Sequence, residues 1–563
     1  MMRLLIFLFI LTTQGLAQEP SATTITLGLF TTRTIHSLTG TPLGANAWRQ
    51  DCATCQHAAL HAPLHFEHLN HALRLGGNLR IQSEGDVPPI EAAGVYTIAP
   101  TSDGLRVTLQ LPSERYIAAV LSAEAAPDEP PASLEALAIT ARTFAMANLH
   151  RHNADNFDIC DSTHCQALHL GPIRPAIAQA VRNTAGITLW FGPHHASIYY
   201  TQHCSGISEA ASDIWPDEHT PYLTSHADPY CLRRSPAAWQ ADVLIGDLNR
   251  IASEQHWNLP TPITGIRITQ HTSSGRAKLL EISSPTRTAT ISASSLHFGI
   301  NRTLGWNRIR SDFYTVVVAR DMLHFTGRGY GHGVGLCQTG AFQMALEHHS
   351  AAEILAFYFP DTRPGLTPSG GLWHEETVGP LTLRTMEPNP EVTQAARFAW
   401  QRALALLPPA GETPRPNIIF APTTELFRQM AAGPGYLLAV TRGSQITLQP
   451  LPILKRNGPI EPLLLHEFLH TLIESQSTDK APLWLREGLP EALGNLNSAY
   501  TAPTSSLATI QQRLADPLSL VECQHAHRDA AAIVRTLGHT YSLTVMRQWL
   551  RDGVPAQVQQ TLH

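Results

Sequence analysis

Apolar and polar residues alternate along the first part of the chain, which is the pattern of strands with one buried face. Four segments show this alternation, with glycine and proline between them: residues 23–30, 79–85, 94–100 and 105–112. From Glu114 the apolar residues recur at helical spacing instead, most clearly over residues 133–152. Ser133 follows two prolines there and is predicted to be the N-cap. We therefore predict a β-rich region over residues 22–110 and a region of mixed α and β structure after it.

The later parts of the chain also mix predicted strands and helices. Strands and loops are predicted from residue 187 to about residue 318, and a single helix is predicted over residues 341–359. The segment FPDTRPGLTPSGGLW is rich in Pro, Gly, Ser and Thr, so we place a linker at residues 361–378. Beyond it, residues 379–563 alternate a helix, three short strands and further helices, which predicts a separate α+β domain.

The first residues predict export from the cytoplasm. Arg3 is the lone positive charge before an apolar run from Leu4 to Leu11, and small residues follow at 15–17, so residues 1–18 are predicted to be a signal peptide. No other apolar run approaches the ~20 residues of a membrane-spanning helix, so no span is expected after signal cleavage. The predicted location is the periplasm, the cell envelope or the extracellular space.

Composition narrows the classes of partner. Charged residues make up only 15% of the chain and the net charge is -6, so the chain lacks the basic surface that nucleic-acid binding requires. Histidine is enriched, at 29 residues, which is compatible with metal binding. The chain has eight cysteines, and in an exported protein cysteine pairs such as Cys52 and Cys55 are predicted to form disulfides.

A zinc-binding pattern lies near the carboxyl end, where residues 463–472 read LLLHEFLHTL. Residues four apart lie on one face of a helix, so His466 and His470 can bind one zinc ion together. Glu467 can then take a proton from the zinc-bound water and act as the catalytic base. Such a zinc ion needs a third protein ligand, and Glu487, seventeen residues after His470 in PLWLREGLPEAL, is placed on the next predicted helix.

The spacing of these residues resembles the gluzincin metallopeptidases over about residues 380–550. The resemblance implies that Glu487 is the third zinc ligand. Glu491, one helical turn further on, is predicted to support a ligand, and Tyr541 is a candidate to steady the oxyanion. Two other interpretations stay open: a core helix with incidental histidines, and a zinc-binding fold without activity.

Four ordered segments between about residues 105 and 360 carry a second pattern. They are LPSERYIAAVLSAEAAPDEPPASLEALAITARTFAMA, CDSTHCQ, the pair SIYYTQHCSG and PYLTSHADPYC, and GRGYGHGVGLCQTGA. Together they resemble the family of stage II sporulation protein D (SpoIID) and the amidase enhancers (LytB), which acts on bacterial peptidoglycan. We assign residues 111–360 to this SpoIID/LytB domain.

The resemblance implies a lytic transglycosylase in which one glutamate, at the position of Glu124, performs both proton transfers. It protonates the glycosidic oxygen and then takes the proton of the MurNAc 6-hydroxyl, which requires one carboxyl with a raised pKa. The glycine-rich backbone of GRGYGHGVGLCQ can approach a sugar chain closely. The substrate-binding candidates in this segment are Arg328, Tyr330, His332 and Gln338. The amidase-enhancer branch of the family implies instead a non-catalytic peptidoglycan-binding module.

The segment CDSTHCQ has two interpretations. Cys160, His164 and Cys165 have donor atoms for zinc, and the family resemblance implies a metal there, but a disulfide between the two cysteines is equally compatible with export. Cys204 and Cys231 can complete either a metal site or a second disulfide. In all, the sequence predicts an α+β, multi-domain protein with a SpoIID-like wall-acting region and a zincin-like domain. Its predicted cofactor is zinc and its predicted partner is the glycan strand of peptidoglycan, with a cell-wall amidase as a further candidate.

Overall fold

The computed structural model describes residues 24–44, 46–52, 55–431, 435–494, 502–515 and 519–562. The predicted signal peptide, residues 1–18, lies outside the described residues. The chain is 36% helical and 26% strand and forms several sheets, which confirms the predicted α+β class. In the described part of the chain no helix has both the length and the apolar character needed to cross a membrane.

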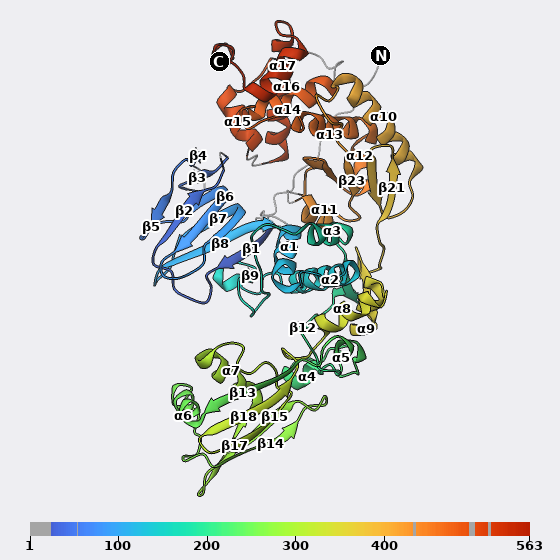
Figure 1. The fold of residues 1–563 in the computed structure, drawn as a ribbon. Coiled ribbons are helices and arrows are strands. Elements are labelled where there is room, and N and C mark those ends of the chain that lie inside the picture. The colour runs from blue at the N-terminus through green and yellow to red at the C-terminus, as the bar shows by residue number, and fades with distance from the viewer. Residues whose placement is uncertain are drawn as a thin grey trace, which may run out of the picture.

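The amino-terminal part forms a large sheet, drawn in blue in Figure 1. Nine of the described strands belong to it, and along its main path their order is β4-β3-β6-β7-β8-β1-β9. All four strands predicted from the alternation are present. The strands are β1 (Thr24–Leu29), β2 (Leu38–Pro42), β3 (Trp48–Gln50), β4 (Ala58–Ala59), β5 (Leu64–Phe66), β6 (Leu73–Ser83), β7 (Ile90–Pro100), β8 (Leu105–Pro112) and β9 (Ile159–Cys160).

Two helices follow this sheet and share its hydrophobic core. Helix α1 (Ser113–Glu124) continues directly from β8, and α2 (Pro131–Ala147) packs against α1. Apolar residues of the sheet and of both helices belong to one buried cluster, so the β-rich region and the start of the SpoIID-like region form one packed unit. The N-cap prediction is wrong: α2 begins at Pro131, which suits the first helical position because proline lacks the N–H, and Ser133 lies inside the first turn.

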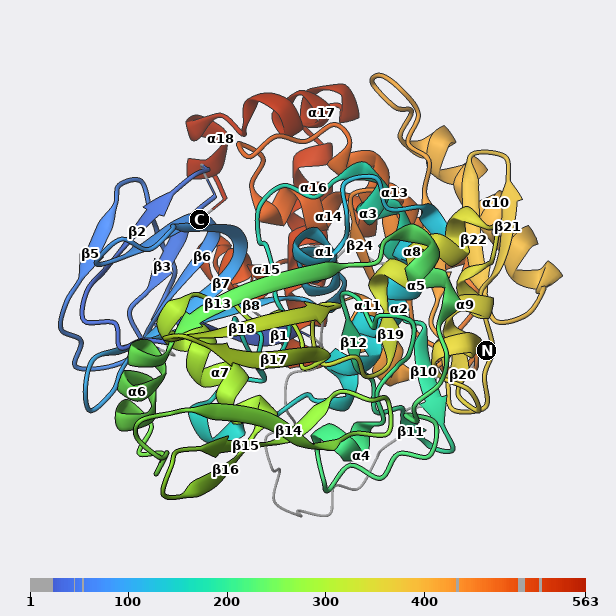
Figure 2. The same cartoon turned by 60° about the horizontal axis from the view of Figure 1, so that its bottom comes forward.

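Residues 239–325 form a smaller unit with a core of their own. It is the green part at the bottom of Figure 1, and Figure 2 brings it to the front. Two three-stranded sheets, β13-β18-β17 and β14-β15-β16, pack with two helices. The elements are β13 (Ala238–Leu244), α6 (Ile245–Glu254), β14 (Gly265–His271), β15 (Ala277–Ser283), β16 (Thr288–Ser292), α7 (Ala293–Leu304), β17 (Tyr314–Ala319) and β18 (Met322–Arg328).

The chain then returns to the first core. Strand β12 (Tyr200–Thr201), which precedes the smaller unit in the sequence, pairs in parallel with β19 (Leu336–Cys337), which follows it. The single helix predicted over residues 341–359 is wrong: the chain forms α8 (Gln338–Leu346) and α9 (Ala351–Tyr358), separated where Ser350 and Glu353 form a capping box. The other elements here are α3 (Pro175–Asn183), β10 (Thr188–Phe191), β11 (His194–His195), α4 (Ala211–Ile214), α5 (Pro229–Arg234) and β20 (Arg363–Gly365).

The segment predicted as a linker, residues 361–378, is largely structured. Strand β20 pairs with β10, and the Trp373 Nε1–H donates a hydrogen bond to the Ala185 carbonyl at 2.9 Å. Strand β21 (His374–Val378) already belongs to the carboxyl-terminal sheet. The segment rich in proline and glycine therefore connects two hydrophobic cores, and much of it is strand.

The carboxyl-terminal part has its own hydrophobic core and is drawn in orange and red at the top of Figure 1. Its sheet has the order β21-β22-β23-β25-β24. The remaining strands are β22 (Leu381–Thr385), β23 (Asn417–Phe420), β24 (Ala439–Arg442) and β25 (Gln445–Leu448). The helices are α10 (Pro390–Leu406), α11 (Thr424–Ala431), α12 (Leu451–Asn457), α13 (Ile460–Glu474), α14 (Leu483–Gly494), α15 (Leu507–Ala515), α16 (Leu520–Gly538), α17 (Leu543–Asp552) and α18 (Ala556–Gln560).

Candidate functional site

Glu124 is the last residue of α1 and lies beside the first residue of α8, Gln338. The Gln338 Nε2–H donates to Glu124 Oε2 at 3.1 Å, across 214 positions of sequence. Burial raises the pKa of the Glu124 carboxyl, and the hydrogen bond from Gln338 only partly opposes this effect. The fold thus joins the first and last of the four family-like segments at one carboxyl whose pKa is raised.

Two residues that were not singled out from the sequence, Tyr200 and Gln166, complete the surroundings of Glu124. Burial and the nearby negative charge of Glu124 raise the pKa of Tyr200. Gln166 Nε2 donates to Tyr200 Oη at 3.3 Å, and its Oε1 accepts from the Tyr116 hydroxyl at 3.0 Å. Gln166 and Tyr200 come from the second and third family-like segments, so all four segments meet here. Membership in those segments was the sequence signal that pointed to them.

The other glutamates close to Glu124 in sequence have structural partners. Glu114 forms an ion pair with the buried Arg142 at 2.6 Å, Glu129 accepts the Ala126 N–H at 3.1 Å, and Glu135 accepts from the Asn183 amide at 2.7 Å. Of these neighbouring glutamates, Glu124 alone bonds to a residue of the glycine-rich segment within the described part of the chain.

His332 lies in an aromatic setting. Burial and the positive charge of Arg276 lower the pKa of His332 to about 4, so the ring is neutral near pH 7. The Val334 N–H donates to its Nδ1 at 3.0 Å, and its ring centroid lies 5.2 Å from that of Trp215. Trp215 in turn stacks on Tyr199 at 4.3 Å. The ring of His332 therefore packs as a neutral group beside Trp215 and Tyr199.

Arg328 and Tyr330 point to residues of the 239–325 unit. Arg328, exposed at the end of β18, lies over the ring of Phe313 at 4.0 Å, and the Tyr330 hydroxyl donates to Asn307. The predicted substrate-binding residues therefore fall into three places, one of which is the aromatic setting of His332. Gln338 lies at Glu124, while Arg328 and Tyr330 contact the neighbouring unit.

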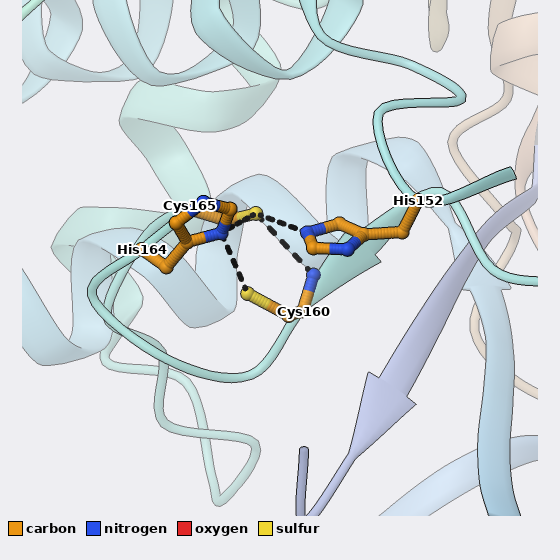
Figure 3. A group of neighbouring side chains, drawn as sticks. All are labelled: His152, Cys160, His164 and Cys165. Atoms are coloured by element: carbon orange, nitrogen blue, oxygen red, sulfur yellow. Dashed lines mark hydrogen bonds between the residues drawn. The ribbon is translucent and has the colours of Figure 1, made fainter. Parts of the chain in front are cut away.

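Cys160, His164 and Cys165 gather with His152, a residue that sequence reasoning missed (Figure 3). Their donor atoms all lie within 4.8 Å of one another, with His152 Nε2 3.4 Å from Cys165 Sγ and His164 Nδ1 3.7 Å from Cys160 Sγ. The two thiols are not joined to each other. Two histidines and two cysteines form a donor set that fits tetrahedral zinc. Cys52 and Cys55, by contrast, form a disulfide as predicted.

The residues of the carboxyl-terminal zinc-binding pattern also lie close to one another. The Nε2 atoms of His466 and His470 on α13 lie 3.1 Å apart, and Glu487 Oε2 on α14 lies 3.5 Å from His470 Nε2. Glu491 Oε2 lies 3.4 Å from His466 Nδ1, which is the place of a carboxylate that orients a metal-binding histidine. The buried Glu467 accepts a hydrogen bond from the Thr441 hydroxyl at 2.5 Å. Two imidazoles and a carboxylate are the donor types found in catalytic zinc sites.

His527 on α16 is a further member of this group. Its Nε2 lies 3.2 Å from Glu487 Oε2 and its Nδ1 lies 2.8 Å from the Cys523 carbonyl. The helical spacing of Cys523 and His527, four apart, was a signal in the sequence. Tyr541, the candidate to steady the oxyanion, lies in the turn after α16, where its ring packs on Trp549 at 4.9 Å between ring centroids.

Comparison with known families bears on the part of the chain that holds Glu124. Residues 101–191 match the family model described as stage II sporulation protein. This match covers β8, α1, α2 and the cluster of Figure 3, and it supports a domain of the SpoIID type in this chain. The match ends at residue 191, so it carries no information on residues 379–563.

Three relatives are similar to this chain, and the names of two of them agree with the family match. The chain is 28% identical over 272 residues to an uncharacterized protein of Brachyspira hyodysenteriae, covering 48% of this chain and 71% of that protein. It is 24% identical over 280 residues to the amidase enhancer of Bacillus subtilis, covering 42% of this chain and 39% of the enhancer. It is 25% identical over 272 residues to stage II sporulation protein D of B. subtilis, covering 45% of this chain and 74% of that protein. Each alignment spans less than half of the chain.

Proposed function

We propose that this is an exported cell-wall protein that binds and cleaves the glycan strands of peptidoglycan as a lytic transglycosylase, with a zinc metallopeptidase-like domain behind it. The observation that carries the first part is the Glu124–Gln338 contact, which unites segments far apart in sequence at one carboxyl of raised pKa. The similarity to stage II sporulation protein D supports the same assignment.

The chemistry needs one carboxyl that serves first as acid and then as base. Protonated Glu124 donates to the oxygen between MurNAc and GlcNAc while the bond to C1 of MurNAc breaks. The carboxylate then accepts the proton of the MurNAc 6-hydroxyl, whose oxygen closes on C1 to form a 1,6-anhydro end without consuming water. Gln338 bonds to Oε2 and so restrains the orientation of the carboxyl.

The test is digestion of peptide-stripped glycan strands by the purified protein, followed by mass spectrometry. New 1,6-anhydro ends are expected. Their absence, together with stimulation of an added cell-wall amidase, would favour the alternative function, that of a non-catalytic amidase enhancer. That alternative rests on the similarity to the B. subtilis amidase enhancer.

Replacing Gln338 with alanine is expected to move the pH profile of glycan cleavage. The hydrogen bond from Gln338 lowers the pKa of Glu124, so its loss raises that pKa further. Cleavage requires the protonated acid and declines as pH rises through the pKa, so the alkaline decline should move to higher pH.

The measurement is the initial rate of anhydro-end formation between pH 4 and 9. Thr339→Ala is the matched control, because Thr339 neighbours Gln338 on α8 but bonds to the Gln202 carbonyl. An alkaline limb that stays in place in the Gln338 variant would contradict the role assigned to this contact.

The second module is proposed to be a zinc peptidase. Its support is the convergence of His466, His470 and Glu487 from two helices, with Glu491 behind His466. Zinc, when bound there, supplies the Lewis acid that polarises a scissile carbonyl and activates water. Glu467, on the same helix, is the base that accepts a proton, and Thr441 orients its carboxylate.

The cluster of Figure 3 is proposed to bind zinc through His152, Cys160, His164 and Cys165. The two thiols should then resist alkylation in the native protein and react once a chelator has removed the metal. Peptide mapping after labelling identifies which cysteines reacted. Thiols that react only after treatment with a reductant would show a disulfide instead.

A further inference from the structure

Three cysteines and an aspartate meet in the interior at a place apart from the sites described above. Cys204, Asp228, Cys231 and Cys337 are each 0% exposed. Their candidate donor atoms all lie within 4.8 Å of one another. They come from three stretches of chain: the one after β12, the start of α5, and the end of β19.

The distances fit a shared metal ion better than a covalent pair. Cys204 Sγ lies 3.5 Å from Cys231 Sγ, whereas the sulfurs of a disulfide are about 2.05 Å apart. Two sulfurs on one tetrahedral zinc ion, each about 2.3 Å from the metal, are roughly 3.8 Å apart. Asp228 Oδ2 lies 3.1 Å from Cys204 Sγ, so the carboxylate stands at the same centre.

The surrounding groups hold these side chains in place. The Cys204 N–H points to Cys337 Sγ at 3.3 Å, and the Gly206 N–H points to Cys231 Sγ at 3.1 Å. Tyr358, itself buried, donates its hydroxyl to Asp228 Oδ2 at 2.9 Å. Hydrogen bonds of this kind orient the ligands of metal sites and favour their ionised forms.

Asp228 Oδ1 accepts the N–H groups of Tyr230 and Cys231 as the N-cap of α5, so Oδ2 is the carboxylate oxygen that lies among the three sulfurs. The buried Arg276 pairs with other groups: its guanidinium donates to the Cys204 and Ile207 carbonyls and lies 3.7 Å from the carboxylate of Glu209. A divalent cation at the centre of the cluster would be within reach of all four donor atoms, and thiolate ligands favour zinc among the available divalent ions.

We propose that Cys204, Asp228, Cys231 and Cys337 form a structural zinc site with four protein ligands and no open position. The site is distinct from the cluster of Figure 3, since the two groups share no residue. It ties together three segments of the SpoIID-like region. One of its ligands, Cys337, directly precedes Gln338 at the start of α8. The metal would therefore fix the position from which Gln338 reaches Glu124, although the site itself requires no catalysis.

Zinc content of a variant that lacks the other two candidate sites provides the test. The background variant carries Cys160→Ser, Cys165→Ser, His466→Ala and His470→Ala. Purified by gel filtration and measured by plasma mass spectrometry, it is expected to hold one zinc per chain. Adding Cys337→Ser should abolish that zinc, whereas adding Cys523→Ser should leave it, because Cys523 lies in the other module. A background variant without zinc would overturn the proposal.

Two measurements cover the case in which Cys337→Ser fails to fold. Cobalt in place of zinc in the background variant should give the sulfur-to-cobalt charge-transfer absorption of a thiolate site, and its absence would count against the proposal. In the wild type, alkylation after denaturation without reductant should label all six cysteines outside the Cys52–Cys55 disulfide. A peptide cross-linked through Cys204 and Cys231 would overturn the proposal and identify a disulfide.

Discussion

Replacing Glu124 with glutamine is expected to abolish the formation of 1,6-anhydro ends on glycan strands. A positioned general acid or base contributes about 10²- to 10⁴-fold, and here one carboxyl performs both steps, so a loss of at least about 10³-fold is expected. The glutamine side chain has nearly the same shape, and its amide oxygen can still accept the hydrogen bond from Gln338. The fold should therefore be kept while the proton transfers are lost.

The rate is measured by mass spectrometry of digested, peptide-stripped strands, with thermal unfolding to confirm the fold. Glu135→Gln is the matched control: Glu135 is a nearby glutamate on α2 that bonds only to Asn183 among the bonds described, and its replacement should leave the rate unchanged. Unchanged cleavage by E124Q would remove Glu124 from the mechanism. Binding to insoluble peptidoglycan should survive in E124Q, which separates a catalytic defect from lost affinity.

Replacing His466 with alanine is expected to remove one zinc ion per chain from the purified protein. His466 and His470 stand 3.1 Å apart on one helix face, and a zinc ion held by three protein ligands does not tolerate the loss of one of them. Glu467→Gln should keep the zinc ion but lower peptide cleavage about 10²- to 10⁴-fold, because only the base is lost. Wall peptides and casein serve as the substrates.

Zinc is counted by plasma mass spectrometry and peptide cleavage by release of free amines. His525→Ala is the matched control for the metal count, since His525 is an exposed histidine on α16, two residues before His527. Equal zinc in wild type and the His466 variant would refute the site. Casein or wall-peptide cleavage that survives Glu467→Gln would instead refute its peptidase role. Glu491→Gln should weaken zinc binding by about 10- to 100-fold, as expected for a carboxylate behind a metal-binding histidine.

The two proposed activities would act on different parts of one polymer. Peptidoglycan has sugar strands, which suit the Glu124 site, and peptide stems, which suit a zinc peptidase. Because each module has its own hydrophobic core, each activity can be removed without unfolding the other. Variants E124Q and E467Q, tested separately and together on intact wall, therefore report whether the two activities act on the same material.

Periodicity predicted the local elements well where the chain buries one face. The strands β1, β6, β7 and β8 and the helices α2 and α10 follow directly from apolar spacing, because side-chain direction repeats every two residues in a strand and every 3.6 in a helix. The wrong predictions concern where helices begin and where one helix is interrupted. Ser133 resembles an N-cap, yet Pro131 begins the helix, and Ser350 caps a second helix inside a run that is apolar enough to read as one.

The sequence by itself determined the chemical types at both sites: a lone glutamate before an alanine-rich helix, and the paired histidines of α13 with a glutamate one helix later. Only the tertiary structure decided which distant residues join them. Tyr200 and Gln166 beside Glu124, His152 with the CDSTHCQ cysteines, His527 beside Glu487, and Cys337 with Cys204 and Cys231 are long-range contacts. Such contacts depend on how separate elements pack, and local spacing along a chain carries no information about that packing.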